Sequence, residues 1–323
     1  MKGKDLRIIY MGTPDFAVAG LKLLVENEYK IVGVITMPDK PAGRGRKINE
    51  SAVKKYAKEN KLNILQPEKL KNPEFLKELK ELKADLQIVV AFRMLPEIVW
   101  SMPRMGTFNL HASLLPQYRG AAPINWAIIN GEKKTGVTTF ILDKEIDTGK
   151  ILFQEKVSIG ENDNMEDVHD RLMNLGADLI LKTVEAIAEN NLKPIPQNQI
   201  HTKIYLKPAP KIFKEDCKID WSLPAEKVRN LIRGLSPYPA AWTEILNSQG
   251  KIFSMKIFSA EIGETTKLAS GTILSDGKKE IKIAAAGNFL RILDLQISGK
   301  KRMNVPAFLN GFHEINDYKI NIE

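Results

Sequence analysis

The stretch LRIIYMGTPDF, residues 6–16, indicates the fold class of this chain. Its apolar part, Leu6 to Met11, is typical of a strand buried inside a parallel sheet. The strand stops at Gly12, after which Thr13 can act as the N-cap of a helix and Pro14 suits a first helical turn. We therefore predict a strand that leads directly into a helix, the first unit of an alternating α/β fold.

The alternation of strand and helix continues through the first half of the chain. Further strands are predicted at 31–36, 62–65, 85–92 and 107–111, and helices at 51–60 and 73–82. This pattern is typical of a doubly wound, mostly parallel sheet that binds its ligand beyond the carboxyl ends of the strands. The first turn has one glycine where a dinucleotide site needs three, and no phosphate loop with its lysine is present. NAD and ATP are therefore not expected.

The second half of the chain changes character. Two more strands, 135–143 and 151–159, and a long helix, 165–189, lead to the proline-containing stretch 190–211, which lacks an apolar period. A helix at 225–235 is followed by short alternating segments at 241–246, 251–257, 271–274, 281–284 and 290–297. Short strands with glycine-containing turns indicate a small antiparallel barrel. The proline-containing stretch is expected to be the linker between this barrel and the first half of the chain.

Composition restricts the class of protein. A chain of 323 residues, 43% hydrophobic and 27% charged, is typical of a globular protein with two domains. Because no apolar run approaches the roughly 20 residues that span a bilayer, we expect a cytoplasmic protein without a membrane partner. Cys217 is the single cysteine, which excludes an intramolecular disulfide, and the four histidines lack the spacing of zinc ligands. No metal is expected.

Positive charge is concentrated in two places. Residues 203–323 carry 19 Lys and Arg against 13 Asp and Glu, which is +6 of the net charge of +9. The stretch 37–47, MPDKPAGRGRK, has four basic residues and one acidic residue. This distribution favours a polyanionic partner. Two other interpretations stay open, because a basic domain can serve solubility alone and such a stretch can be a solvated insertion.

Candidate catalytic side chains lie in the stretch FNLHASLLPQYRG, residues 108–120. If 107–111 is a strand, Asn109 and His111 lie on one face, roughly 7 Å apart, at the mouth of the sheet. Asp147, in the turn 143–149, is the natural candidate to lie against His111. A polar strand end is often only solvated, and a turn rich in Asp and Gly needs no function. The pattern therefore indicates a catalytic site without excluding a structural role.

Five motifs carry a resemblance to a known family. They are NLHASLLP with YRG (109–120), DTG (147–149), PAGRG (41–45), KIDWS (218–222) and SPYP (236–239). With them the sequence closely resembles the methionyl-tRNA formyltransferase family over nearly its whole length, and the first two motifs belong to all folate-dependent formyltransferases. The resemblance implies a Rossmann-like α/β catalytic domain over 1–189, a linker over 190–207 and an OB-like β-barrel domain that binds tRNA over 208–323.

The resemblance also implies an activity. The formyl group of 10-formyltetrahydrofolate, the formyl-donor co-substrate, would pass to the amino group of initiator methionyl-tRNA through a tetrahedral intermediate. Asn109 would donate to the oxyanion, His111 would act as general acid, and Asp147 would hold His111 in the useful tautomer. Folate contacts are implied at Ser113, Leu114, Leu115, Pro116, Phe92, Arg93, Met94 and Leu95, and tRNA contacts at Arg44, Arg46, Lys47, Lys211, Lys214 and Lys218. A monomer is expected.

Other activities share the same three catalytic residue types. Glycinamide ribonucleotide formyltransferase normally stops after the catalytic domain, and sugar-nucleotide formyltransferases lack the basic loop around Arg44. Hydrolysis of the formyl folate needs no second substrate. An RNA-binding protein with a degenerate enzyme fold would explain the charge but not why Asn109, His111 and Asp147 are all present. Transfer to methionyl-tRNA is the favoured interpretation.

Overall fold

The computed structural model describes residues 3–42, 47–200, 205–312 and 314–321 of the chain. They divide into two compact units. Unit 1 comprises residues 1–120, 135–157 and 169–208, and unit 2 comprises residues 121–134, 158–168 and 209–323. Among the described residues, no helix is both long and apolar enough to cross a bilayer.

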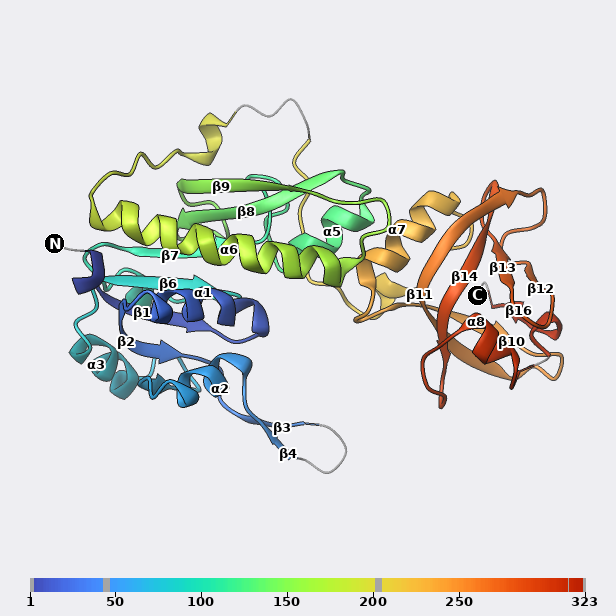
Figure 1. Ribbon diagram of the computed structural model, residues 1–323, viewed down its shortest axis with the longest axis horizontal. Coiled ribbons are helices and arrows are strands. Elements are labelled where there is room, and N and C mark those ends of the chain that lie inside the picture. The colour runs from blue at the N-terminus through green and yellow to red at the C-terminus, as the bar shows by residue number, and fades with distance from the viewer. Residues whose placement is uncertain (1–2, 43–46, 201–204, 313, 322–323) are drawn as a thin grey trace. The chain divides into compact units, whose positions relative to one another are not determined.

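Unit 1 is built on a seven-stranded sheet with the strand order β5-β2-β1-β6-β7-β8-β9 (Figure 1). The pairs β1·β2, β1·β6, β2·β5 and β6·β7 are parallel, and β7·β8 is antiparallel. This is the mostly parallel, Rossmann-like sheet that the alternating sequence predicts. The strands are β1 (Arg7–Gly12), β2 (Lys30–Ile35), β5 (Ile64–Leu65), β6 (Leu86–Val90), β7 (Thr107–His111), β8 (Lys134–Ile141) and β9 (Ile151–Ser158).

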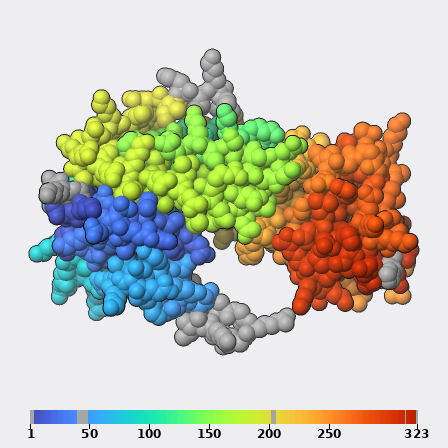
Figure 2. Space-filling model, viewed as in Figure 1, coloured from blue at the N-terminus to red at the C-terminus, as the bar shows by residue number. Residues whose placement is uncertain are grey.

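Helices cover both faces of this sheet. They are α1 (Asp15–Glu26), α2 (Ala52–Glu59), α3 (Pro73–Glu81), α4 (Glu97–Trp100) and α6 (Met165–Ala188). On one face, Met11 and Val89 pack in a cluster with Phe75 of α3 and Val99 of α4. On the other, α6 runs along β7 and β8, and its atoms form much of the viewed surface of unit 1 (Figures 1 and 2). The polar end of β7 therefore emerges from a sheet that helices cover on both faces.

Unit 2 contains a six-stranded antiparallel path, β12-β13-β14-β11-β10-β16, with β15 paired to β14. This is the predicted OB-like barrel. Its strands are β10 (Ala241–Leu246), β11 (Ile252–Thr265), β12 (Ile273–Ser275), β13 (Ile281–Ala284), β14 (Asn288–Ile297), β15 (Met303–Asn304) and β16 (Lys319–Ile320). Helices α5 (Pro123–Ile129), α7 (Ala225–Leu235) and α8 (Val305–Leu309) complete the unit with the short turn η3 (Glu215–Cys217).

Two segments from the first half of the chain group with the C-terminal residues in unit 2. Asn125 Nδ2 of α5 donates to the carbonyl of Gly234 in α7 (2.8 Å), and Arg233 Nη1 donates to the carbonyl of Asp163 (2.9 Å). These contacts join 121–134 and 158–168 to α7 within unit 2. The predicted domain limits, 1–189, 190–207 and 208–323, stay a prediction.

The prediction for the start of α1 is wrong. The N-cap is Pro14, the helix begins at Asp15, and no side chain caps it. The hydroxyl of Thr13 is buried and has no hydrogen-bond partner among the described residues. Pro14 in an extended conformation (φ −80°, ψ 175°) turns the chain into the helix without the cap that Thr13 was expected to supply.

Three further differences concern the remaining elements. The basic stretch 37–47, where a loop was expected, overlaps a two-stranded antiparallel pair, β3 (Lys40–Ala42) and β4 (Lys47–Asn49). Strand β11 continues to Thr265, past the predicted end at Ile257, because bulges let it bend while it stays paired to β14. The last elements, β15, α8 and β16, were not predicted, since each is too short to show a hydrophobic period.

Candidate active site

Strand β7 presents Asn109 and His111 on the same face of the sheet, since side chains two residues apart on a strand share a face. Asn109 pairs with Val89 of β6 and Phe140 of β8, so it lies between two neighbouring strands. Among the described residues, the side-chain amide of Asn109 has no hydrogen-bond partner, and the residue is half-buried. Its two N–H donors are therefore available to a ligand at the carboxyl end of β7.

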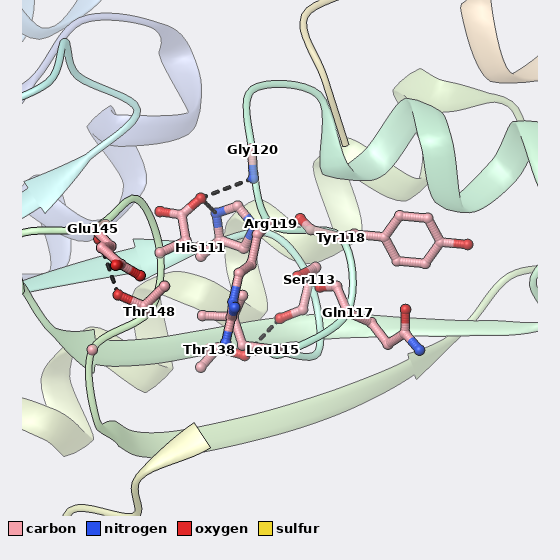
Figure 3. A network of polar contacts seen from close by, with 12 residues as sticks. His111, Ser113, Leu115, Gln117, Tyr118, Arg119, Gly120, Thr138, Glu145 and Thr148 are labelled. Carbon is pink, nitrogen blue, oxygen red and sulfur yellow. Dashed lines mark hydrogen bonds and ion pairs between the residues drawn. The ribbon is translucent and has the colours of Figure 1, made fainter. Parts of the chain in front are cut away.

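His111 is buried, and its two ring nitrogens face different groups (Figure 3). Its Nε2 lies 2.8 Å from the carbonyl oxygen of Tyr118. A carbonyl can only accept, so we assign the proton of the neutral ring to Nε2. The other nitrogen, Nδ1, faces Asp147 Oδ2 at 3.7 Å, beyond hydrogen-bond distance. The Tyr118 carbonyl thus selects the tautomer, a contact that the sequence reasoning missed because a backbone carbonyl leaves no mark in a motif.

Asp147 is placed by the loop that follows β7. The Gly120 amide donates to Asp147 Oδ2 at 2.9 Å, the same oxygen that faces His111. The structure therefore brings together two of the predicted catalytic residues, His111 and Asp147, from segments 36 positions apart in the sequence. The Asp147 side chain is 13% exposed, so the carboxylate is largely shielded from water.

The backbone around these residues has unusual conformations. Tyr118 (φ 59°) and Asp147 (φ 56°) are left-handed, which is uncommon for residues other than glycine and costs about 1–3 kcal/mol each. Gly120 has φ 127°, and a Cβ built on Gly149 would lie 1.7 Å from the carbonyl oxygen of Ile141. The glycines of the YRG and DTG motifs are therefore required by geometry.

The predicted folate loop, 113–116, is hydrogen-bonded to its surroundings and mostly buried. Ser113 Oγ donates to the carbonyl of Gln117 (2.6 Å), and Thr138 Oγ1 donates to the carbonyl of Ser113 (2.6 Å). Ser113, Leu115 and Pro116 are buried, and Leu114 is half-buried. Contact with a ligand would thus use Leu114 and the backbone of the loop.

The second predicted folate segment, 92–95, also contains both buried and exposed side chains. Leu95 is buried and Phe92 packs against the same cluster, whereas Met94 is 70% exposed. Arg93 Nη1 donates to the carbonyl of Glu68 (2.7 Å) and Nη2 to that of Pro67, while its Nε is buried without a partner among the described residues. Burial lowers the pKa of this guanidinium. Arg93 therefore holds the segment in place, and Met94 is the side chain most open to a ligand.

The predicted tRNA contacts fall into two groups. Arg44 and Arg46 lie outside the described residues, and Lys47 begins β4. In unit 2, the ammonium groups of Lys214 and Lys218 lie 5.2 and 5.9 Å from the centre of the Trp242 ring, and that of Lys211 lies 5.3 Å from the Phe213 ring. The structure thus brings Lys214 and Lys218 together on one aromatic residue that the sequence reasoning did not single out.

Neither a metal cluster nor a reactive thiol accompanies this site in the part of the chain that the structure describes. No group of three or more His, Cys, Asp or Glu side chains could hold a metal ion there. Burial, with the nearby Asp216 carboxylate, raises the pKa of the Cys217 thiol, whose Sγ donates to the Phe213 carbonyl at 3.2 Å. Cys217 is thus a buried thiol rather than a nucleophile.

An amide donor beside an imidazole and a carboxylate, at the carboxyl end of a Rossmann-like sheet, is the arrangement of a group-transfer enzyme in which the acceptor itself is the nucleophile. Residues 6–184 match the family described as Formyl transferase, and residues 211–313 match the Formyl transferase C-terminal domain. The methionyl-tRNA formyltransferase of Bacteroides thetaiotaomicron is 60% identical over 99% of this chain and 100% of its own length. That of Flavobacterium johnsoniae is 53% identical over 98% and 99%. The chain belongs to the methionyl-tRNA formyltransferase family.

Solved structures with the same fold are more distant in sequence. An N-formyltransferase from Helicobacter canadensis, in complex with folinic acid and dTDP-3-aminofucose, has a TM-score of 0.65 and 22% identity over 89% of this chain and 98% of its own. HypX from Aquifex aeolicus, in complex with tetrahydrofolic acid, has a TM-score of 0.62 and 20% identity over 96% of this chain and 47% of its own. At this identity the similarity supports the fold alone.

Proposed function

We propose that this chain transfers the formyl group of 10-formyltetrahydrofolate to the amino group of initiator methionyl-tRNA. The products are N-formylmethionyl-tRNA and tetrahydrofolate, and the reaction serves translation initiation in the cytoplasm. The observation that carries the proposal is the Asn109 amide, which has no hydrogen-bond partner among the described residues and shares a strand face with His111. We further propose that the enzyme acts as a monomer, without a metal and away from membranes.

The residues of the site have distinct roles in this reaction. The amine of the acceptor attacks the formyl carbon, and the formyl oxygen gains negative charge. Asn109 donates to that oxygen, and a positioned donor of this kind contributes about 10²–10³ in rate. His111 accepts the proton that the attacking amine loses and supplies a proton to the leaving nitrogen as its bond to the formyl carbon breaks, which contributes about 10²–10⁴. The Asp147 carboxylate, 3.7 Å from Nδ1, offsets positive charge on the imidazole when the ring is protonated.

No covalent enzyme intermediate is needed, and the states of the Ser113 hydroxyl and the Cys217 thiol agree with this. The hydroxyl of Ser113 donates to the Gln117 carbonyl, and the Cys217 thiol is buried in unit 2. We propose that the formyl donor lies over Leu114, the backbone of 113–116 and the exposed Met94. Phe92, Arg93 and Leu95 would hold the segment that carries Met94 in place.

The basic residues support RNA as the acceptor. The ammonium groups of Lys214 and Lys218 both lie over the ring of Trp242. The Nε1 of Trp242 also donates to the Lys214 carbonyl at 2.9 Å. Pairs of fixed cations suit the phosphates of an RNA backbone. We propose that they act with Lys211, and that Arg44, Arg46 and Lys47 contact the acceptor end of the tRNA.

The test is formylation of charged initiator tRNA by the pure protein with 10-formyltetrahydrofolate, followed by the mass of the aminoacyl group. Uncharged tRNA and charged elongator methionyl-tRNA serve as controls. Efficient formylation of an amino sugar nucleotide, with no transfer to methionyl-tRNA, would contradict the proposal, as would release of formate with no acceptor.

The proposed tRNA contact at Arg44 has its own test. Arg44→Ala is expected to weaken tRNA binding and to lower its salt dependence by the share of one phosphate contact, about 0.9 in slope, while folate affinity stays unchanged. An equal loss of folate affinity would assign the loop another role.

A further inference from the structure

Gln197 is a buried polar residue inside the predicted linker. It begins the short turn η2 (Gln197–Gln199) and is 5% exposed. Its Nε2 donates to the carbonyls of Asp147 (2.8 Å) and Gly149 (2.9 Å). Its Oε1 accepts from Arg119 Nε (3.1 Å) and Nη2 (2.6 Å). Both ends of this one amide are therefore satisfied by residues of the candidate active site.

Arg119 lies between the two residues that hold the catalytic pair. The Tyr118 carbonyl accepts from His111 Nε2, and the Gly120 amide donates to Asp147 Oδ2. Through Arg119, Gln197 restrains the loop that sets the tautomer of His111. Through its Nε2, Gln197 restrains the turn that carries Asp147.

This restraint acts where the backbone is unfavourable. Asp147 and Tyr118 both have left-handed backbone conformations, which persist only if surrounding contacts determine them. The two bonds from Gln197 Nε2 bracket the Asp147–Gly149 turn at both ends. The linker is therefore a structural part of the active site and not only a connection to unit 2.

We propose that Gln197 is a positioning residue for formyl transfer, which holds the His111–Asp147 pair in its reactive arrangement through Arg119 and the 147–149 turn. The inference rests on the proposed function for its kinetic consequence. A side-chain amide is needed because one end must donate to two carbonyls while the other accepts from a guanidinium. Glutamate can accept from Arg119 but cannot donate, and leucine can do neither.

The kinetic experiment compares three variants in the full chain. Gln197→Leu is expected to lower kcat about 10²-fold, the typical effect of a small misplacement of reacting groups, with little change in the KM of the formyl donor. Gln197→Glu separates the two halves of the contact, and we expect it to resemble Gln197→Leu because the carbonyls of Asp147 and Gly149 lose their donor. Gln199→Leu, the same substitution at an exposed position of the same turn, is the matched control and should keep the wild-type kcat.

A second readout needs no reaction. The exchange of the Gly120 amide proton reports directly on its bond to Asp147. It can be followed with ¹⁵N-glycine and ¹³C-carbonyl-arginine labels, because only three Arg-Gly pairs occur in the sequence, at 44–45, 119–120 and 233–234. Gln197→Leu is expected to speed exchange at Gly120 at least tenfold. Gly234, in helix α7 of unit 2, is the internal control and should not change.

The outcomes separate the two proposals. A wild-type protein that fails to formylate methionyl-tRNA contradicts the proposed function, while Gly120 exchange still decides whether Gln197 positions Asp147. A wild-type kcat in Gln197→Leu, or a change in Gly120 exchange that Gly234 shares, overturns the positioning role. Faster exchange at Gly120 alone, with kcat lowered and KM kept, supports it.

Discussion

Replacement of Trp242 by leucine should weaken the binding of tRNA without removing any charge. In the structure, the indole supports the ammonium groups of Lys214 (5.2 Å) and Lys218 (5.9 Å). Trp242 also binds the lysine-bearing segment at its two ends. Its Nε1 donates to the Lys214 carbonyl (2.9 Å), and its carbonyl accepts from the Ile219 amide (2.8 Å). Leucine keeps the backbone bond and removes the ring and its N–H.

The size of the effect follows from the ordering of two lysine side chains. Without the ring, both must be immobilised when they bind a phosphate, which costs about 0.5–1.5 kcal/mol for each side chain. The expected total is about 1–3 kcal/mol, or a roughly 5- to 150-fold increase in Kd. Both charges stay, so the slope of log Kd against log salt should change little. A double variant, Lys214→Ala with Lys218→Ala, should lower that slope by about 1.8.

The assay is tRNA binding by fluorescence anisotropy between about 50 and 200 mM salt. Trp242→Phe is the matched control, because it keeps an aromatic face for the lysines and loses only the N–H, and it should retain most of the affinity. An unchanged Kd for formyl donor shows that unit 1 is intact. The reasoning is refuted if Trp242→Leu binds tRNA like wild type, or if its salt slope falls as far as that of the double lysine variant.

Three further predictions concern unit 1. Asn109→Ala should lower kcat about 10²–10³-fold with the KM of the formyl donor nearly unchanged, and steady-state kinetics with methionyl-tRNA checks this. Although burial opposes ionisation of Asp85, its bonds from the Arg7 amide (3.0 Å) and Arg104 Nε (2.6 Å) outweigh this and hold its pKa below the ordinary 3.8. Asp85→Asn should therefore lower the free energy of unfolding by about 1–3 kcal/mol at pH 7. The difference from wild type should vanish as the pH falls below that lowered pKa, and urea titrations at pH 7 and below the lowered pKa would measure both values. Gly149→Ala should destabilise the fold by about 1–3 kcal/mol, seen as a lower Tm, because the new methyl group would meet a backbone carbonyl of β8; a wild-type Tm would mean that the turn can relax.

Much of the architecture was predictable because it depends on local pattern. The apolar run at Leu6 to Met11 forms β1, and the alternation that follows it forms the mostly parallel sheet. Helix α2 begins after Ser51, whose hydroxyl accepts from the Lys54 amide as an N-cap should. Thr13 also carries a hydroxyl group and lies in a similar position, yet Pro14 is the cap, because the local rule does not record how the preceding strand directs the chain.

The limits of the pattern are clearest in β11. Alternation of buried and exposed residues stops at Ile257 and Phe258, both buried, so a strand of period two ends there. The structure continues the strand because pairing with β14 absorbs the irregularity in bulges. Pairing between strands is a property of two segments, and one segment read alone cannot reveal it.

The sequence by itself determined the residue types of the site and the strand that carries them. Asn109 and His111 share a face because a strand alternates. The sequence also offered Asp147 as the partner of His111, and the structure places it 3.7 Å from Nδ1. Only the tertiary structure decided the rest of the surroundings: the Tyr118 carbonyl on Nε2 of His111, and Gln197 holding the turn and the loop. The Tyr118 carbonyl on His111 and the carbonyls of Asp147 and Gly149 on Gln197 are backbone groups, which every residue carries, so these contacts arise from how the chain is folded and leave no signal in the order of the side chains.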